Sequence, residues 1–153
     1  MALESEDQSR EFSIKTAYVF HFAELVQWPE SNLVAINICL QSTNRLARSI
    51  GILEGQTIGD ASIHVITDYP KSLEGCQMLL VTALDELTES VQDHARLQHI
   101  LLLSDQASFA AHGGMLEFNR RDDKLNLVVN IKAVKQAGLK ISSKLLRMAQ
   151  ILE

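Results

Sequence analysis

The sequence predicts a single three-layer α/β domain, with a mostly parallel sheet, a C-terminal antiparallel hairpin and helices on both faces. Its length of 153 residues corresponds to one domain of typical size. Uninterrupted apolar runs at 78–81 and 100–103 are typical of strands that are buried on both faces of a parallel sheet. Segments with helical periodicity alternate with such strands, and this alternation is the order found in three-layer α/β domains.

The first expected element is a helix over residues 11–28. Its apolar side chains recur at helical spacing and form one broad stripe: Ile14, Tyr18, Val19, Phe22, Leu25 and Val26. Pro29 disfavours helical geometry at the residue before it, so the helix should end at Trp28. Residues 1–10 are expected to be a disordered N-terminal segment of this single domain, which covers residues 1–153.

Strands and helices are then expected to alternate through the middle of the chain. Period-two alternation or continuous apolar character predicts strands over 33–40, 62–67, 77–82 and 99–103. Helical spacing of the apolar residues predicts helices over 46–53 and 84–97. The strands should therefore lie side by side, with the helices covering the sheet.

The C-terminal third is expected to add an antiparallel hairpin and two helices. Apolar strands over 115–118 and 125–129 flank the polar residues 119–123, an arrangement typical of a hairpin. The helices are expected over 131–137 and 143–151, with Asn130 and Ser142 as N-caps and Gly138 as the stop. The tail of the chain is therefore predicted to be helical.

Composition and charge restrict the function classes. Hydrophobic residues make up 46% of the chain and charged residues 22%, as in ordinary soluble domains. The net charge is −5 with the two signs interspersed, which is unlike the clustered basic footprint of a nucleic-acid-binding protein. The longest apolar run is far shorter than the roughly 20 residues of a membrane-spanning helix, so no membrane insertion is expected. Residues 1–7 lack the features of a signal peptide, so we expect either a cytosolic chain or a secreted one without its signal.

The two cysteines, Cys39 and Cys76, are 37 positions apart. Closely spaced ligand pairs are missing, which argues against a zinc site. The cysteines either form a disulfide or are two buried thiols that behave as small hydrophobic side chains. A disulfide that closes a loop of this size would stabilise the fold by about 4 kcal/mol.

No motif for catalysis, a metal or a cofactor stands out. His94 and His99 are five positions apart, which is not the i, i+4 spacing of two metal ligands on one helix face. The glycines at 112–115 occur without the G-x-S-x-G nucleophile elbow of α/β-hydrolases, and 55–59 lacks the ending of a phosphate-binding loop. We therefore expect no catalytic residue, no metal and no cofactor.

Five segments occur in order across nearly the whole chain: IKTAYVFHFAELVQWP (14–29), INICLQS (36–42), GCQMLLV (75–81), ILLLSDQASFAAHGGMLEF (100–118) and KLNLVVNIKAVKQAGLKISSKLLRMAQIL (124–152). The most specific parts include the helix that ends in Trp28-Pro29 and the stretch from Ser104 to Met115. Together, the segments resemble the YfiR-like family of small periplasmic regulators.

This resemblance implies a compact α/β domain that is exported to the periplasm, is often dimeric and has no known enzymatic activity. In the best understood system of the family, such a protein binds the periplasmic sensor domain of a membrane diguanylate cyclase and holds it inactive, which restrains cyclic di-GMP synthesis. Family members carry cysteines at the positions of Cys39 and Cys76, so the resemblance implies a disulfide between them. Because the chain has only two cysteines, it lacks the second pair that redox-regulated members can carry.

The leading functional hypothesis is a non-enzymatic periplasmic regulator that represses a membrane diguanylate cyclase or a related receptor. A homodimer of this chain is a further expected association. Its contact surface is expected on the C-terminal segment: Leu145, Met148 and Leu152. The alternative is a periplasmic small-ligand-binding module serving another membrane receptor, with a site at the carboxyl ends of the strands: Thr67, Asp68, Ser104 and Asp105. An enzyme would require Ser104, His112 and a carboxylate to converge.

Overall fold

The computed structural model describes residues 2–30, 32–71, 73–122 and 124–153. Its strands are β1 (Val26–Gln27), β2 (Ala35–Leu40), β3 (Thr57–Ile58), β4 (Ala61–Ile66), β5 (Met78–Leu80), β6 (Leu101–Ser104), β7 (Leu116–Arg121), β8 (Lys124–Asn130), β9 (Lys140–Ile141) and β10 (Gln150–Leu152). The α-helices are α1 (Ala2–Leu25), α2 (Ala47–Ile50), α3 (Glu89–Gln98), α4 (Ile131–Gln136) and α5 (Ser143–Leu146). Short 3-10 turns are η1 (Gly51–Leu53), η2 (Leu84–Glu86) and η3 (Ala110–His112).

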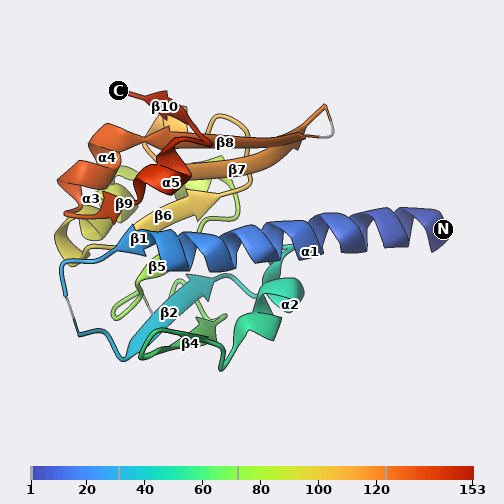
Figure 1. The fold of residues 1–153 in the computed structure, drawn as a ribbon, viewed down its shortest axis with the longest axis horizontal. Helices are drawn as coiled ribbons and strands as arrows, with labels where there is room; N and C mark the ends of the chain where they lie inside the picture. The colour runs from blue at the N-terminus through green and yellow to red at the C-terminus, as the bar shows by residue number, and fades with distance from the viewer. Residues whose placement is uncertain (1, 31, 72, 123) are drawn as a thin grey trace.

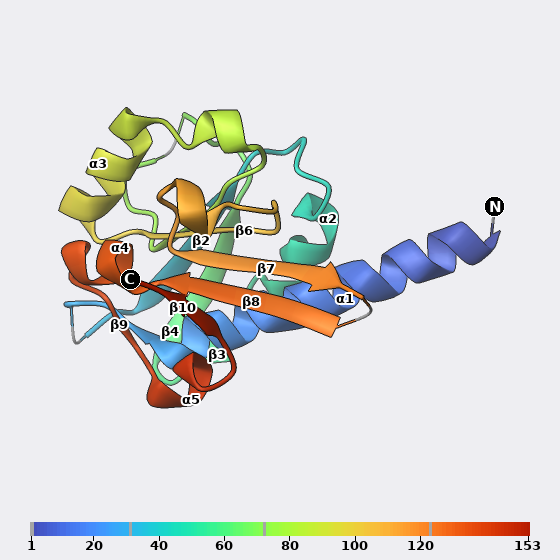
Figure 2. The same cartoon turned by 90° about the horizontal axis from the view of Figure 1, so that it is seen from above.

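A large sheet forms the middle layer, and helices cover both of its faces (Figure 1, Figure 2). In the described part of the chain its strands have the order β10-β8-β7-β6-β5-β2-β4-β3. Neighbouring strands from β4 to β7 are parallel, β7 and β8 form an antiparallel hairpin, and β10 runs parallel to β8 at the edge. In Figure 2, α1 and α5 lie on one face of the sheet and α3 lies on the other. The predicted fold class is confirmed.

The core lies on both sides of β5 and β6. Every residue of these two strands is at most 1% exposed, which explains why all of them except Ser104 are apolar. On one face, Phe22 of α1 meets Phe118 of β7 edge to face, with the ring centroids 5.4 Å apart. Both rings are fully buried, so this contact anchors α1 on the sheet.

The boundaries of α1 differ from the expected helix at both ends. The helix stops at Leu25, because the next two residues form β1 and pair with β9 in a small antiparallel sheet. At the other end, residues 2–10 form the first turns of α1 and project beyond the sheet (Figure 1). The expectation of a disordered segment at 1–10 stays a prediction, and its first residue lies outside the described part of the chain.

Cys39 and Cys76 form a disulfide, with their Cα atoms 6.0 Å apart, which confirms the pairing that the family resemblance implied. The bond ties the segment before β5 to the buried strand β2. Gln77 of the same segment forms two further hydrogen bonds. Its carbonyl oxygen accepts from Trp28 Nε1 at 3.1 Å, and its side-chain oxygen accepts from the Asn37 backbone amide at 2.7 Å. The disulfide therefore belongs to a set of contacts that joins β2, the segment before β5 and Trp28, which follows β1.

The C-terminal tail is not helical, so that prediction is wrong. The helix expected over 143–151 ends at Leu146, and Gln150–Leu152 forms β10. The apolar residues of so short a segment fit helical and strand spacing alike, and the edge of β8 supplies the hydrogen-bonding partner that favours the strand. Leu152 consequently lies in an edge strand.

Three other elements have different boundaries from those predicted. The helix expected over 46–53 is α2 followed by η1, and the one expected over 84–97 is η2 followed by α3. Thr88 begins α3 because its hydroxyl accepts from the Val91 amide at 3.2 Å. The hairpin is confirmed with longer strands, and Asp123 of its expected turn lies outside the described residues.

Gly114→Ala is expected to destabilise the fold. A Cβ atom at Gly114 would overlap the fully buried ring of Phe109. Because a close-packed core relaxes only partly, we expect the free energy of unfolding to fall by about 1–3 kcal/mol, measured by urea denaturation. Gly51→Ala is the matched control, since its Cβ would meet nothing within 4 Å and its backbone is right-handed helical. Equal losses of unfolding free energy in Gly114→Ala and Gly51→Ala would show that the contact between Gly114 and the Phe109 ring does not cause the destabilisation.

Candidate docking surface

The residues of the ligand-binding hypothesis lie at the carboxyl ends of two strands that are not neighbours. Thr67 and Asp68 follow β4, whereas Ser104 and Asp105 lie at and just beyond the end of β6. Because β2 and β5 run between β4 and β6, three strand spacings, roughly 14 Å in all, separate the two pairs. The structure does not bring the four residues together, and the ligand site stays a prediction.

Ser104 and Asp105 have partners within the chain. The Ser104 side chain is fully buried, and its hydroxyl donates to the Val81 carbonyl at 2.8 Å and accepts from the Gln106 amide at 3.1 Å. The Asp105 carboxylate lies 2.9 Å from Lys15 Nζ, and these two side chains are only 11% and 6% exposed. The contacts attach α1 and the loop after β6 to the sheet.

Tyr69 directly follows Thr67 and Asp68 at the end of β4, and its environment disfavours the phenolate. Burial raises the pKa of the Tyr69 phenol, and the carboxylate of Glu86 raises this pKa further. The phenol therefore stays neutral at physiological pH and adds no charge to this edge of the sheet.

Ser104 and His112, which the enzyme hypothesis requires to converge, form hydrogen bonds with different groups. His112 is exposed, and its Nδ1 lies 2.7 Å from the carbonyl oxygen of Ser108. The Ser104 hydroxyl donates elsewhere, as described above, and within the described residues no hydrogen bond joins it to His112. The constellation of nucleophile and base that the enzyme hypothesis requires is not formed in this structure.

The three C-terminal residues of the regulator hypothesis lie at different depths. Leu145 is 1% exposed and belongs to the core, whereas Met148 is 60% exposed. Leu152 is half-buried in β10. Ile151, which the sequence analysis did not single out, is 43% exposed in the same strand. The contact surface stays a prediction, in which Met148 and Leu152 can reach a partner and Leu145 supports them from beneath.

The same part of the chain carries a concentration of positive charge. Residues 124–153 contain six Lys or Arg residues and one Glu, a net charge of +5. The rest of the chain contains eight Lys or Arg and eighteen Asp or Glu residues, a net charge of −10. The interpretation that the two signs are interspersed is therefore wrong. Counting charge by segment would have revealed this surface from the sequence.

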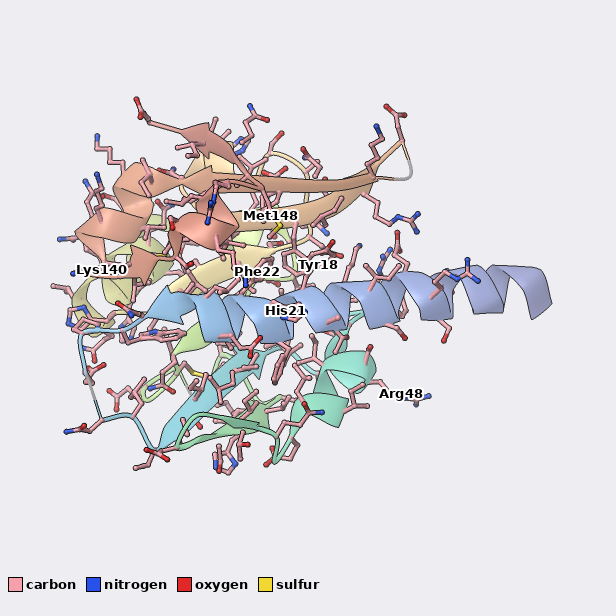
Figure 3. The ribbon with its side chains drawn as sticks, in the orientation of Figure 1. Tyr18, His21, Phe22, Arg48, Lys140 and Met148 are labelled. Carbon is pink, nitrogen blue, oxygen red and sulfur yellow. A yellow bond between two sulfur atoms is a disulfide. The ribbon has the colours of Figure 1, made fainter. Side chains whose placement is uncertain are left out.

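Five of these six cations lie on or directly after elements that meet at one end of the molecule, where α4 packs against β9 and β10 and α5 is their neighbour (Figure 1). The sixth, Lys124, begins β8 next to the hairpin turn, away from this end. We call this surface the cationic end and define it by its exposed residues: Lys132, Lys135, Lys140, Lys144, Arg147, Met148 and Ile151. Figure 3 shows Lys140 and Met148 on one side of α1 and Arg48 of α2 on the other.

The charges of the cationic end are not neutralised by ion pairs in the described part of the chain. The ion pairs found there involve other cations: Lys15, His21, Arg45, His64 and Arg96. Glu24 and Lys140 share the lining of a cavity of about 400 Å³ where α1 ends against β9, without forming an ion pair. Lysine and arginine heads around flexible apolar side chains suit recognition of a second surface, because charge steers the encounter and apolar contact holds it.

Comparison with known proteins agrees with the resemblance seen in the sequence. A family model described as YfiR/HmsC-like matches residues 12–150. A search of curated proteins gives no significant match. Among the described residues, no helix combines the length and apolar character that crossing a bilayer requires.

Proposed function

Because the chain belongs to the YfiR/HmsC-like family of periplasmic regulators of cyclic di-GMP signalling, we propose that it binds the periplasmic domain of an inner-membrane diguanylate cyclase and represses the enzyme. The family is regulatory and non-catalytic, which agrees with a role exerted through protein–protein contact. The periplasm is an oxidising compartment, and the buried disulfide between Cys39 and Cys76 suits such a location.

The observation that carries this proposal is the exposure of Met148 at the cationic end. Large apolar side chains surrounded by charge are typical of the centre of a docking surface, and Met148 is 60% exposed beside the half-buried Leu152. Leu145 lies in the core beneath and fixes the position of α5. The contact therefore involves a surface that is supported by packed residues.

Repression would follow from a difference in affinity for two states of the cyclase. A regulator shifts an equilibrium only by as much as it prefers one state over the other. A 100-fold higher affinity for the inactive state shifts the equilibrium toward that state by about 2.7 kcal/mol. This mechanism requires no chemical step in the regulator.

Calorimetric titration of the protein with the purified periplasmic domain of a membrane diguanylate cyclase from the same organism tests the proposal. We expect saturable binding by the wild type, and binding about tenfold weaker or worse for Met148→Asp. Leu97→Asp is the matched control, since Leu97 is 66% exposed on α3, on the other face of the sheet. Absence of binding by the wild type, or equal affinities of wild type and Met148→Asp, would contradict the proposal. Sedimentation of the free protein would test the expected homodimer.

A further inference from the structure

We propose that the cationic end docks onto an acidic face of the receptor's periplasmic domain, with Met148 and Ile151 meeting an apolar centre within that face. This inference rests on the proposed function and adds the chemistry of the partner. Its basis is the segregation of charge, with +5 on residues 124–153 and −10 on the rest of the chain.

Stability of the fold does not explain this clustering. Lys132 and Lys135 lie three positions apart on α4, and Lys144 of α5 has the same spacing from Arg147, the residue that caps this helix, so each pair of cations repels. The helix dipole favours Lys135, which lies in the last turn of α4. Lys132 lies in the first turn of α4, where the dipole disfavours a cation. An acidic partner would relieve this repulsion.

A protein face fits this surface better than a bilayer does. β10 is the last strand of the sheet order, so one edge of Gln150–Leu152 has no neighbouring strand among the described residues. Partners with their own backbone groups can satisfy such an edge, as extended segments do when they add to a sheet. Within the cationic end, the large exposed apolar side chains are Met148 and Ile151, which form a small centre inside a charged rim, as is usual in a protein interface.

The test measures the affinity for the receptor domain at about 50 and about 300 mM NaCl, over which exposed charges become screened. Wild-type affinity should fall by roughly tenfold or more between these two salt concentrations. Lys144→Glu/Arg147→Glu should bind at least about tenfold more weakly than wild type at low salt and should lose most of the salt dependence. The matched control is Arg45→Glu/Arg48→Glu, which changes the net charge equally just before and within α2 and should stay within about twofold of wild type. Arg48 lies on the other side of α1 from Met148 (Figure 3). Circular dichroism of each variant checks that it is folded.

Each result separates this inference from the proposed function. If Met148→Asp weakens binding while Lys144→Glu/Arg147→Glu binds like wild type, the regulator function stands and the acidic face is ruled out. Equal losses of affinity in Lys144→Glu/Arg147→Glu and Arg45→Glu/Arg48→Glu would show that overall charge, and not the cationic end, determines binding. This result would also overturn the inference. If the wild type does not bind, both ideas fail.

Two other occupants of the cationic end are tested directly. Sedimentation of the protein with vesicles of phosphatidylethanolamine and phosphatidylglycerol tests a lipid surface, and sedimentation velocity of the protein alone tests a second copy. Either kind of association, if Lys144→Glu/Arg147→Glu abolishes it and it competes with the receptor domain, would overturn the inference in favour of that occupant.

Discussion

Loss of the bond between Cys39 and Cys76 is expected to lower the free energy of unfolding by about 4 kcal/mol, because the bond closes a loop of 37 positions in the unfolded chain. Domains of this size have total stabilities of roughly 5–15 kcal/mol, so the loss is a large fraction of the whole. The change is Cys39→Ala/Cys76→Ala, and urea denaturation under oxidising conditions measures it. Both cysteines are buried, at 0% and 3% exposed, so neither is replaced by a polar residue.

Reduced wild-type protein is the matched control, because it keeps both sulfur atoms and lacks only the bond. It should lose nearly as much stability as the double variant, and the difference between them measures the packing of the two sulfur atoms. A double variant within about 1 kcal/mol of the oxidised wild type would contradict the loop-closure argument. The titration with the receptor domain, repeated with reductant, then tells whether the disulfide is needed for recognition or only for stability.

The elements that the sequence predicted well are those whose environment is uniform along their length. β5 and β6 are buried on both faces, so every position except Ser104 is apolar, and a short continuous apolar run is typical of such strands. The β7–β8 hairpin pairs two segments that are close in sequence, and hairpin pairing is local. In both cases the signal and the structure involve neighbouring residues.

The elements that the sequence missed are set by partners distant in the chain. β1 and β9 pair across more than a hundred positions, with Val26 opposite Ile141, and two residues have no periodicity to detect. β10 exists because β8 offers an edge to Gln150–Leu152, so the residues alone do not distinguish it from a helix. Strand order is likewise a tertiary property, which is why Thr67 and Ser104 could be placed at the same edge of a sheet but not at their true separation.

The candidate site shows a different failure, since its strongest signal was present in the sequence. The six cations of residues 124–153 are visible without any structure, but a whole-chain net charge of −5 conceals them. The fold adds what composition does not show: Leu145 is buried, while Met148 and Ile151 are exposed. The location of the cationic end was therefore predictable from the sequence, whereas the exposure of its individual apolar side chains was not.

Asp105→Ala is expected to lower the free energy of unfolding by about 3–5 kcal/mol, because it leaves the Lys15 ammonium buried without its main partner. The two groups are 2.9 Å apart with side chains that are 6% and 11% exposed, so water cannot replace the lost carboxylate easily. Glu11 lies 3.9 Å from the same ammonium and offers only a weak substitute. Since this ion pair ties α1 to the end of β6, thermal and urea unfolding of the variant measure the attachment of α1 to the sheet.

Two comparisons isolate the cause of that loss. Lys15→Met/Asp105→Leu replaces the pair with apolar side chains and should recover to within about 1 kcal/mol of wild type, since burying two charges carries a large desolvation penalty of its own. Asp93→Ala breaks the exposed ion pair with Arg96, whose atoms are 3.0 Å apart and whose side chains are 46% and 54% exposed, and should change stability by less than about 1 kcal/mol. The two ion pairs have nearly the same length, so the difference between their losses measures the effect of burial. A loss for Asp105→Ala no larger than that for Asp93→Ala would show that the ion pair between Lys15 and Asp105 does not hold α1 on the sheet.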